Sequence, residues 1–156
     1  MSPRSSKNCS NKMKRSLITL LLLVLCCLAQ GQESRLKSGP VLQGEVIPES
    51  RLVETLVKGH DIEDLGLTLF HSVRFTATPE ELATVSRLVL EDASGALTRR
   101  TVLSGGLLQS AFLQTSRSGY LAFQSKPSGS GQYAVILVYM EGHVTEKQLR
   151  QMFGKN

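Results

Sequence analysis

Histidines and a short acidic segment are the residues whose chemistry stands out in this sequence. His60-Asp61-Ile62-Glu63-Asp64 places one imidazole beside three carboxylates, and such oxygen atoms are the ligands that a hard cation such as Ca²⁺ prefers. The segment lacks the glycine and the alternating ligand spacing of a known calcium-binding loop. A solvated acidic loop explains it better, so we predict no metal and no cofactor here.

The other two histidines have no evident catalytic partner in the sequence. His71 lies on the inward side of an expected strand, where a hydrogen-bonded histidine is the simplest interpretation, and His143 precedes the expected last helix. No serine lies in the Gly-x-Ser-x-Gly elbow of a hydrolase. A small secreted hydrolase or metal-dependent enzyme that uses His60, His71 and His143 with the acids at 61–64 stays as the alternative to a non-enzymatic protein.

The element that places the protein in the cell is MKRSLITLLLLVLCCLAQGQ, Met13 to Gln32. Lys14 and Arg15 precede an apolar run, Leu17 to Ala29, whose 13 residues fall short of the ~20 that span a bilayer. Small residues follow, which predicts a signal peptide of residues 1–29 or 1–31 cleaved at Ala29, Gln30 or Gly31. We expect a protein of the extracellular space or the secretory-pathway lumen, with no membrane span after cleavage.

Removal of this signal changes the charge and the cysteine content. Five of the 18 lysines and arginines precede residue 30, so 13 basic residues remain against 13 acidic ones. A balanced, scattered charge argues against nucleic-acid binding. Cys9, Cys26 and Cys27 all lie at or before the cleavage site, so the processed domain is expected to fold without disulfides.

The rest of the chain has short apolar segments separated by turn residues, which is typical of an antiparallel β fold. A flexible leader over residues 30–40 precedes one domain over residues 41–156. This domain is predicted to be mainly β, a single antiparallel Greek-key-like β-sandwich. The expected strands are Leu67–Ala77, Val85–Glu91, Leu97–Leu103, Leu107–Gln114, Tyr120–Gln124 and a central, fully covered Tyr133–Tyr139.

Turn and helix signals complete the expected fold. Asp92 to Gly95 is predicted to be a tight turn and Lys126 to Gly131 a loop. Thr145-Glu146-Lys147-Gln148 is a capping box that starts a short C-terminal helix ending near Phe153. Ser50 to Lys58 has apolar residues on one helical face, so an N-terminal helix is predicted there, with a strand as the alternative.

RLVLEDASGALTRR and GGLLQSAFLQTSRSGYLAFQSKPSGSGQYAVILVY resemble the strand order of secretory-pathway β-sandwiches of the GOLD type. They also resemble pre-peptidase C-terminal domains, whose D-x-x-G turn and closing G-x-Y-x-V strand match Asp92–Gly95 and Gly131–Val135. The resemblance implies a luminal or extracellular module that binds other proteins, and it carries over no catalytic residue. Unlike membrane-bound GOLD cargo receptors, this chain has no second hydrophobic span.

We therefore expect a secreted, non-enzymatic protein-binding or accessory module with an unknown protein partner. The candidate interaction surface is the acidic segment Asp61, Glu63 and Asp64 together with Lys126 and Ser128. A peptide precursor is a minor alternative, because Phe153-Gly154-Lys155 resembles an amidation signal. Arg99-Arg100 is predicted to be a solvent-facing pair within a strand.

Overall fold

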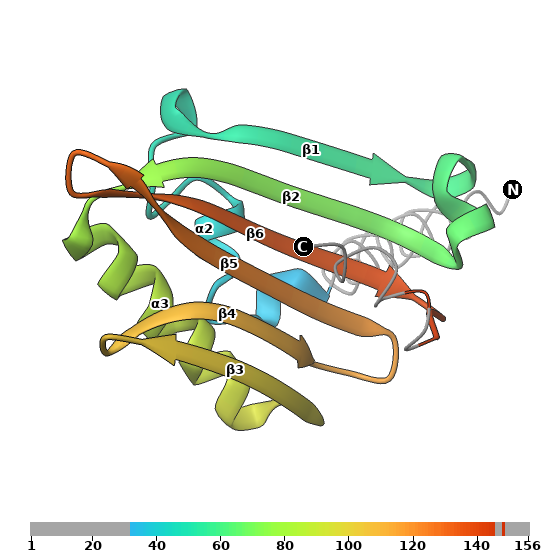
Figure 1. The fold of residues 1–156 in the computed structure, drawn as a ribbon. Coiled ribbons are helices and arrows are strands. Elements are labelled where there is room, and N and C mark those ends of the chain that lie inside the picture. The colour runs from blue at the N-terminus through green and yellow to red at the C-terminus, as the bar shows by residue number, and fades with distance from the viewer. Residues whose placement is uncertain (1–31, 146–147, 149–156) are drawn as a thin grey trace, which may run out of the picture. The chain divides into compact units, whose positions relative to one another are not determined.

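The computed structural model describes residues 32–145 and 148 (Figure 1). The chain divides into two compact units, Met1–Ser34 and Arg35–Asn156. A short 3-10 helix, η1 (Gln32–Arg35), contains the described residues of the first unit. The second unit contains the sheet and the long helix. The predicted cleavage residues Ala29, Gln30 and Gly31 lie outside the described residues.

Six strands of the described chain form one open antiparallel sheet in the order β1-β2-β6-β5-β4-β3. Consecutive strands β3, β4, β5 and β6 are joined by hairpin connections, whereas β1 and β3 form the two edges (Figure 1). The strands are β1 (Val53–Lys58), β2 (Leu67–Ala77), β3 (Thr98–Ser104), β4 (Leu107–Gln114), β5 (Gly119–Gly129) and β6 (Gln132–Gly142). Four further elements are helical: α2 (Gly39–Leu42), η2 (Glu49–Arg51), η3 (Gly59–Leu65) and α3 (Pro79–Gly95).

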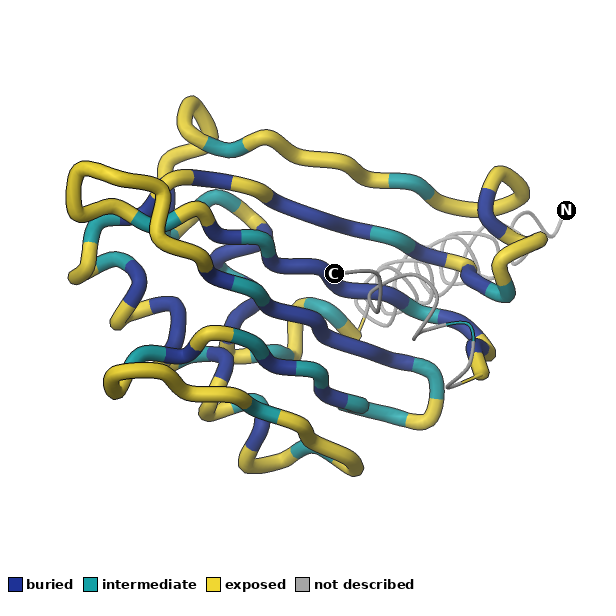
Figure 2. Tube along the Cα trace, in the orientation of Figure 1, coloured by how far each residue is buried: buried dark blue, intermediate teal, exposed yellow. Residues whose placement is uncertain are grey.

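The strands with the clearest alternation in sequence form as predicted. β2 and β4 have the predicted bounds, and along β2 all six odd-numbered residues are buried. β6 lies between β2 and β5 and is buried on both faces over Leu137–Met140, as predicted for the central strand. Figure 2 shows the contrast between this covered centre and the exposed edge strand β3.

The predicted strand Val85–Glu91 and the tight turn after it are wrong, because both belong to helix α3. Its start is fixed by a capping box: Thr78 Oγ1 accepts from Glu81 N at 3.3 Å, and Glu81 Oε2 accepts from Thr78 N at 2.9 Å. Pro79 occupies the first turn, where its missing N–H costs nothing. Leu82, Val85 and Val89 then repeat at helical spacing and are fully buried.

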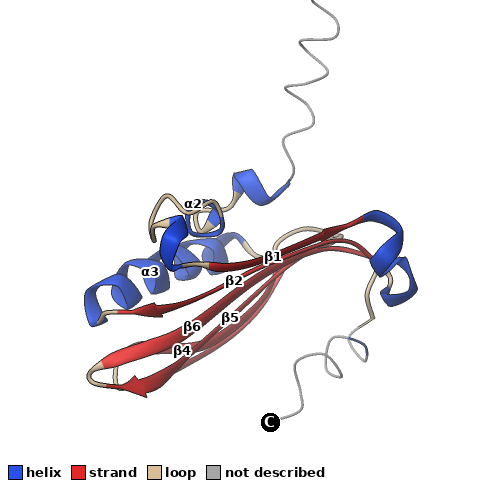
Figure 3. Ribbon diagram, turned by 90° about the horizontal axis from the view of Figure 1, so that it is seen from above, coloured by secondary structure: helices blue, strands red, loops and turns tan. Residues whose placement is uncertain are grey.

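The mainly β, antiparallel fold class is confirmed, with one difference in layering. The strands lie in one sheet, and the second layer consists of α2 and α3 on one face rather than of a second sheet (Figure 3). The main core lies between these helices and the sheet and includes Val41, Leu42, Ile47, Val73, Leu82, Val89, Leu113, Leu121 and Leu137. A smaller cluster, with Tyr120, Val138 and Met140, lies among the side chains of the other face.

Three local expectations need correction. Ser38 and Gly39 are fully buried or nearly so, so the end of the predicted leader is part of the folded unit. The strand alternative holds at Val53–Lys58, and the helical turn before it, η2, is short. The predicted loop Lys126–Gly131 is mostly strand, because β5 and β6 extend to a tight turn in which Ser130 and Gly131 have positive φ.

The cap of the predicted C-terminal helix is present. Thr145 N donates to Gln148 Oε1 at 2.9 Å, and Gln148 N donates to Thr145 Oγ1 at 3.4 Å. The remaining residues of that predicted helix, including Phe153, lie outside the described residues.

Candidate functional site

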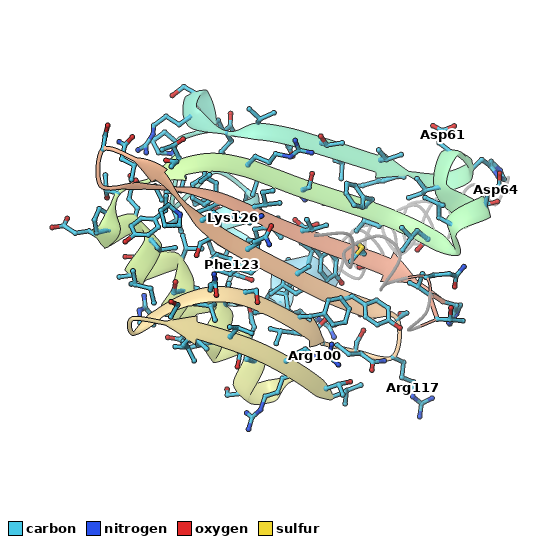
Figure 4. All side chains as sticks on the ribbon, in the orientation of Figure 1. Asp61, Asp64, Arg100, Arg117, Phe123 and Lys126 are labelled. Carbon is cyan, nitrogen blue, oxygen red and sulfur yellow. The ribbon has the colours of Figure 1, made fainter. Side chains whose placement is uncertain are left out.

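The predicted interaction surface is divided between two ends of the sheet. Asp61, Glu63 and Asp64 lie in η3, which precedes the first residue of β2. Lys126 and Ser128 lie near the other end, where β5 and β6 pair beside the last residue of β2. Ten residues of strand separate the two ends, about 33 Å at ~3.3 Å per residue. Figure 4 shows Lys126 well away from Asp61 and Asp64, so these residues do not form one surface.

Two of the three histidines each have a glutamate partner. His60 Nδ1 lies 2.8 Å from Glu63 Oε2 on the exposed surface of η3. His71 Nε2 lies 2.7 Å from Glu54 Oε1, and its side chain is only 7% exposed. His143 is exposed after the end of β6. In the described part of the chain, no three His, Cys, Asp or Glu residues come together as metal ligands would.

Strand β3 is an exposed edge strand of the second unit. Six of its seven residues are exposed and Thr101 is half-buried. β3 pairs with β4 along one edge, and its other edge ends the sheet. An edge strand presents unpaired backbone N–H and C=O groups that another chain can bind. Val102 and Leu103 are 45% and 55% exposed at its end, which places apolar surface beside these groups.

A groove of about 460 Å³ lies next to this edge, between α3 and the start of β4. Its sides are formed by Ala83, Ser86 and Leu90 of α3 and by Gly106, Leu107 and Leu108 at the β3–β4 turn. Leu90 is 37% exposed, whereas Val85 and Val89 of the same helix are fully buried, because Leu90 lies on a different side of α3. The groove is therefore mostly apolar and open to a ligand.

One buried polar atom faces this groove without a partner. Ser86 is 7% exposed, and its Oγ has no hydrogen-bond partner. Among the buried side-chain nitrogen and oxygen atoms of the described residues, this is the one left unpaired. A buried hydroxyl left unpaired costs about 1–3 kcal/mol. In native structures such a group calls for a specific explanation, and a ligand or an ordered water in the groove would supply the missing partner.

The electrostatics of this side of the sheet are one-sided. Between Asp92 and Glu141 the sequence has four basic residues and no acidic one: Arg99, Arg100, Arg117 and Lys126. None of the four makes an ion pair among the described residues, whereas Arg87 at the groove pairs with Glu91, Nη1 to Oε1 2.6 Å. The charged side chains of β3, β4, β5 and the turns that join them are therefore all basic, whereas α3 carries Glu91 in the groove.

We call β3 with the adjoining groove the β3–α3 surface. Sequence reasoning missed it because the groove exists only once α3 packs beside β4, and α3 itself was predicted as a strand. Two signals were present: the acid-free stretch between Asp92 and Glu141, and the capping residues Thr78 and Glu81.

None of the helices in the described residues combines the length and apolar composition that a membrane crossing needs. Comparison with curated proteins and with solved structures found no match. The model of one protein family, described as a family of unknown function (DUF6108), matches residues 22–153. This match extends over most of the sequence, and the chain therefore belongs to the DUF6108 family.

Proposed function

We propose that this protein is a secreted or secretory-pathway, non-enzymatic module that binds another protein through the β3–α3 surface. The observation that carries the proposal is the open edge of β3 beside a groove that holds the unpaired hydroxyl of Ser86. Export is proposed from the signal pattern before Ala29 and from nothing in the fold.

Two features support protein recognition over small-molecule chemistry. A strand with a free edge binds an extended chain through main-chain hydrogen bonds, and pockets beside it select side chains. The groove supplies such a pocket, with apolar walls from Leu90 and Leu107. Leu90 in the groove and Leu103, which pairs with the groove residue Leu108, expose apolar area close together, which is typical of an interaction site.

The histidine-based enzyme has less support. His60 and His71 have separate glutamate partners, Glu63 and Glu54, on different elements. A shared general base or metal would need these groups to converge on one reacting atom.

The test compares two leucines of similar exposure, one inside and one outside the proposed surface. Leu90→Glu places a carboxylate in the groove, and Leu65→Glu, at a position 49% exposed in η3, is the matched control. Each variant is expressed in place of the native protein, and proteins crosslinked to it in its own compartment are identified. We expect the wild type and Leu65→Glu to retain the same partner and Leu90→Glu to lose it.

Circular dichroism and urea unfolding confirm that both variants are folded. A folded Leu90→Glu variant that retains the same partners as the wild type contradicts the proposed surface. Loss of function in a folded His71→Gln variant, with binding intact, would instead favour the enzyme.

A further inference from the structure

The two adjacent arginines of β3 point to opposite faces of the sheet. Arg99 pairs with Leu113 of β4, which lies in the core on the helical face, and Arg100 pairs with Phe112, which belongs to the cluster of the other face. Directly paired residues share a face, and neighbours in a strand alternate. A strand added beside β3 therefore meets one guanidinium group on each of its faces.

These two cations have a further arginine, Arg117, on the same side and no acidic residue in the neighbouring strands. β3, β4 and β5 contain no aspartate or glutamate. Arg117 lies in the β4–β5 turn, at the end of the sheet where Thr98 pairs with Gln114, and Figure 4 shows Arg100 and Arg117 on the same side of the molecule. A carboxylate that arrives at this edge meets only attraction from these strands.

The second half of β3 has a different chemistry. Val102 and Leu103 follow the arginines, and Leu103 pairs with Leu108, a residue of the groove. The edge thus changes along its length from a basic half to an apolar half. A complementary strand must have the same two halves, with acidic and apolar side chains.

We propose that β3 accepts, as a seventh antiparallel strand, an extended segment of another protein in which apolar residues precede adjacent acidic residues. This inference rests on the proposed function and specifies its partner. Antiparallel pairing continues the pattern of every strand pair in the described sheet, and it brings the acidic residues opposite Arg99 and Arg100. The apolar residues then lie beside Leu103 and the groove.

A peptide explains this surface better than a nucleic acid does. The free edge offers backbone N–H and C=O groups in the spacing of a β-ladder, which a polypeptide matches and a phosphate backbone does not. β3 also contains no aromatic residue on which a base could stack.

The test uses two synthetic probes and two variants. The first probe is a seven-residue Thr/Val peptide that ends in two adjacent glutamates, and the second has lysines in place of both glutamates. Binding to the purified protein is measured by fluorescence anisotropy, and the site is mapped by NMR shifts of backbone amides. The variants are the double substitution Arg99→Gln with Arg100→Gln, and Lys58→Gln on the other edge, β1, as the matched control.

We expect the glutamate peptide to shift amides of β3 and to bind about tenfold more weakly to the double variant, because two exposed ion pairs are lost. The lysine peptide should bind to the wild type at least about tenfold more weakly than the glutamate peptide does. The Lys58→Gln variant should bind the glutamate peptide with the affinity of the wild type. Raised salt should reduce the affinity for the glutamate peptide.

Four results would overturn the inference. Equal binding of both peptides at β3 would show that β3 binds a strand but does not select acidic residues. If neither peptide binds at millimolar concentration but Leu90→Glu still loses the cellular partner, the added strand is ruled out. The proposed function would then stand without it. Tighter binding of a short single-stranded oligonucleotide assigns the arginines to phosphate. Self-association of the wild type that the double variant abolishes identifies a second copy as the occupant.

Discussion

Ser38 Oγ donates to Asp92 Oδ2 at 2.6 Å, which connects the segment before α2 to the last turns of α3. The same carboxylate accepts the backbone N–H of Ser38 at 2.9 Å and that of Lys37 at 2.7 Å. Three donors 54 and 55 residues away in sequence thus converge on one side chain, and this contact holds the N-terminal segment over the helical face of the core.

We predict that Asp92→Ala lowers the free energy of unfolding by about 2–3 kcal/mol, because it leaves the buried hydroxyl and N–H of Ser38 without an acceptor, whereas the exposed Lys37 N–H can bond to water. Urea unfolding followed by circular dichroism measures the change. Asp61→Ala, at an exposed position of η3, should stay within about 0.5 kcal/mol of the wild type. Equal stability of the two variants would contradict this role of Asp92.

A second prediction concerns acid stability. Hydrogen bonds from Arg51, at 2.7 and 3.0 Å, and from the Thr78 N–H lower the pKa of Glu81 from 4.5 to about 2. Because the pKa is lower in the folded state, Glu81 stabilises the fold fully at pH values above its unfolded pKa near 4.5. This contribution is lost as the pH falls from there to about 2. Because the pair is partly exposed, we expect a loss of only about 1 kcal/mol.

Glu81→Gln isolates this effect, since the amide oxygen still accepts the Thr78 N–H but carries no charge. The difference in unfolding free energy between pH 6 and pH 3 should be smaller for Glu81→Gln than for the wild type. An identical pH dependence in both proteins would show that Glu81 does not carry the effect.

The central strand supplies a third prediction. Leu137 is fully buried in the main core, so Leu137→Ala should cost about 2–5 kcal/mol. Ile136 is half-buried on the other face and should cost less, while Arg100→Ala should change stability by no more than about 0.5 kcal/mol. Chemical denaturation ranks the three variants, and a smaller loss for Leu137→Ala than for Ile136→Ala would contradict the assigned faces of β6.

Ser86 should behave in the opposite way from a core residue. Ser86→Ala removes an unpaired buried hydroxyl and places the best helix former inside α3, so we predict an increase in stability of about 1 kcal/mol. The same change should weaken binding of the cellular partner if that partner hydrogen-bonds to Ser86. Thermal melts and the crosslinking assay measure the two effects, and a fall in melting temperature would mean that the hydroxyl has a partner.

Processing supplies a fifth prediction. The exported protein should begin at Gln30 or Gln32, and its melting temperature should not change with reductant because it then contains no cysteine. N-terminal sequencing and melts with and without dithiothreitol check both statements. An exported chain that retains Leu17–Ala29 would rule out the predicted cleavage.

The strands were predictable where apolar and polar side chains alternate along the sequence. β2 and β4 follow from side chains of period two, and β6 from an apolar run between turn residues. Helix α3 was not predicted because Leu88-Val89-Leu90 and the following Asp-Ala-Ser-Gly have the local composition of a strand and a turn. The opposing signal was the pair Thr78 and Glu81, whose reciprocal hydrogen bonds favour a helix before the apolar run begins.

The candidate site depended even less on local pattern. The groove needs Leu90 of α3 and Leu107 of β4 to come together, and no short stretch of sequence contains that information. The charge of the β3 edge, in contrast, was already visible in the sequence, because Arg99 and Arg100 lie in a stretch without acidic residues.

The arginines of β3 also bear on solubility. An exposed edge strand with apolar residues at its end is a hazard for aggregation, since two such edges can pair with each other. Antiparallel pairing of two full-length β3 strands would place the Arg99-Arg100 pair of each copy opposite Val102 and Leu103 of the other, so four guanidinium groups would share one short interface with no carboxylate in the flanking strands. Their mutual repulsion disfavours the aggregate while leaving the edge open to a strand of opposite charge.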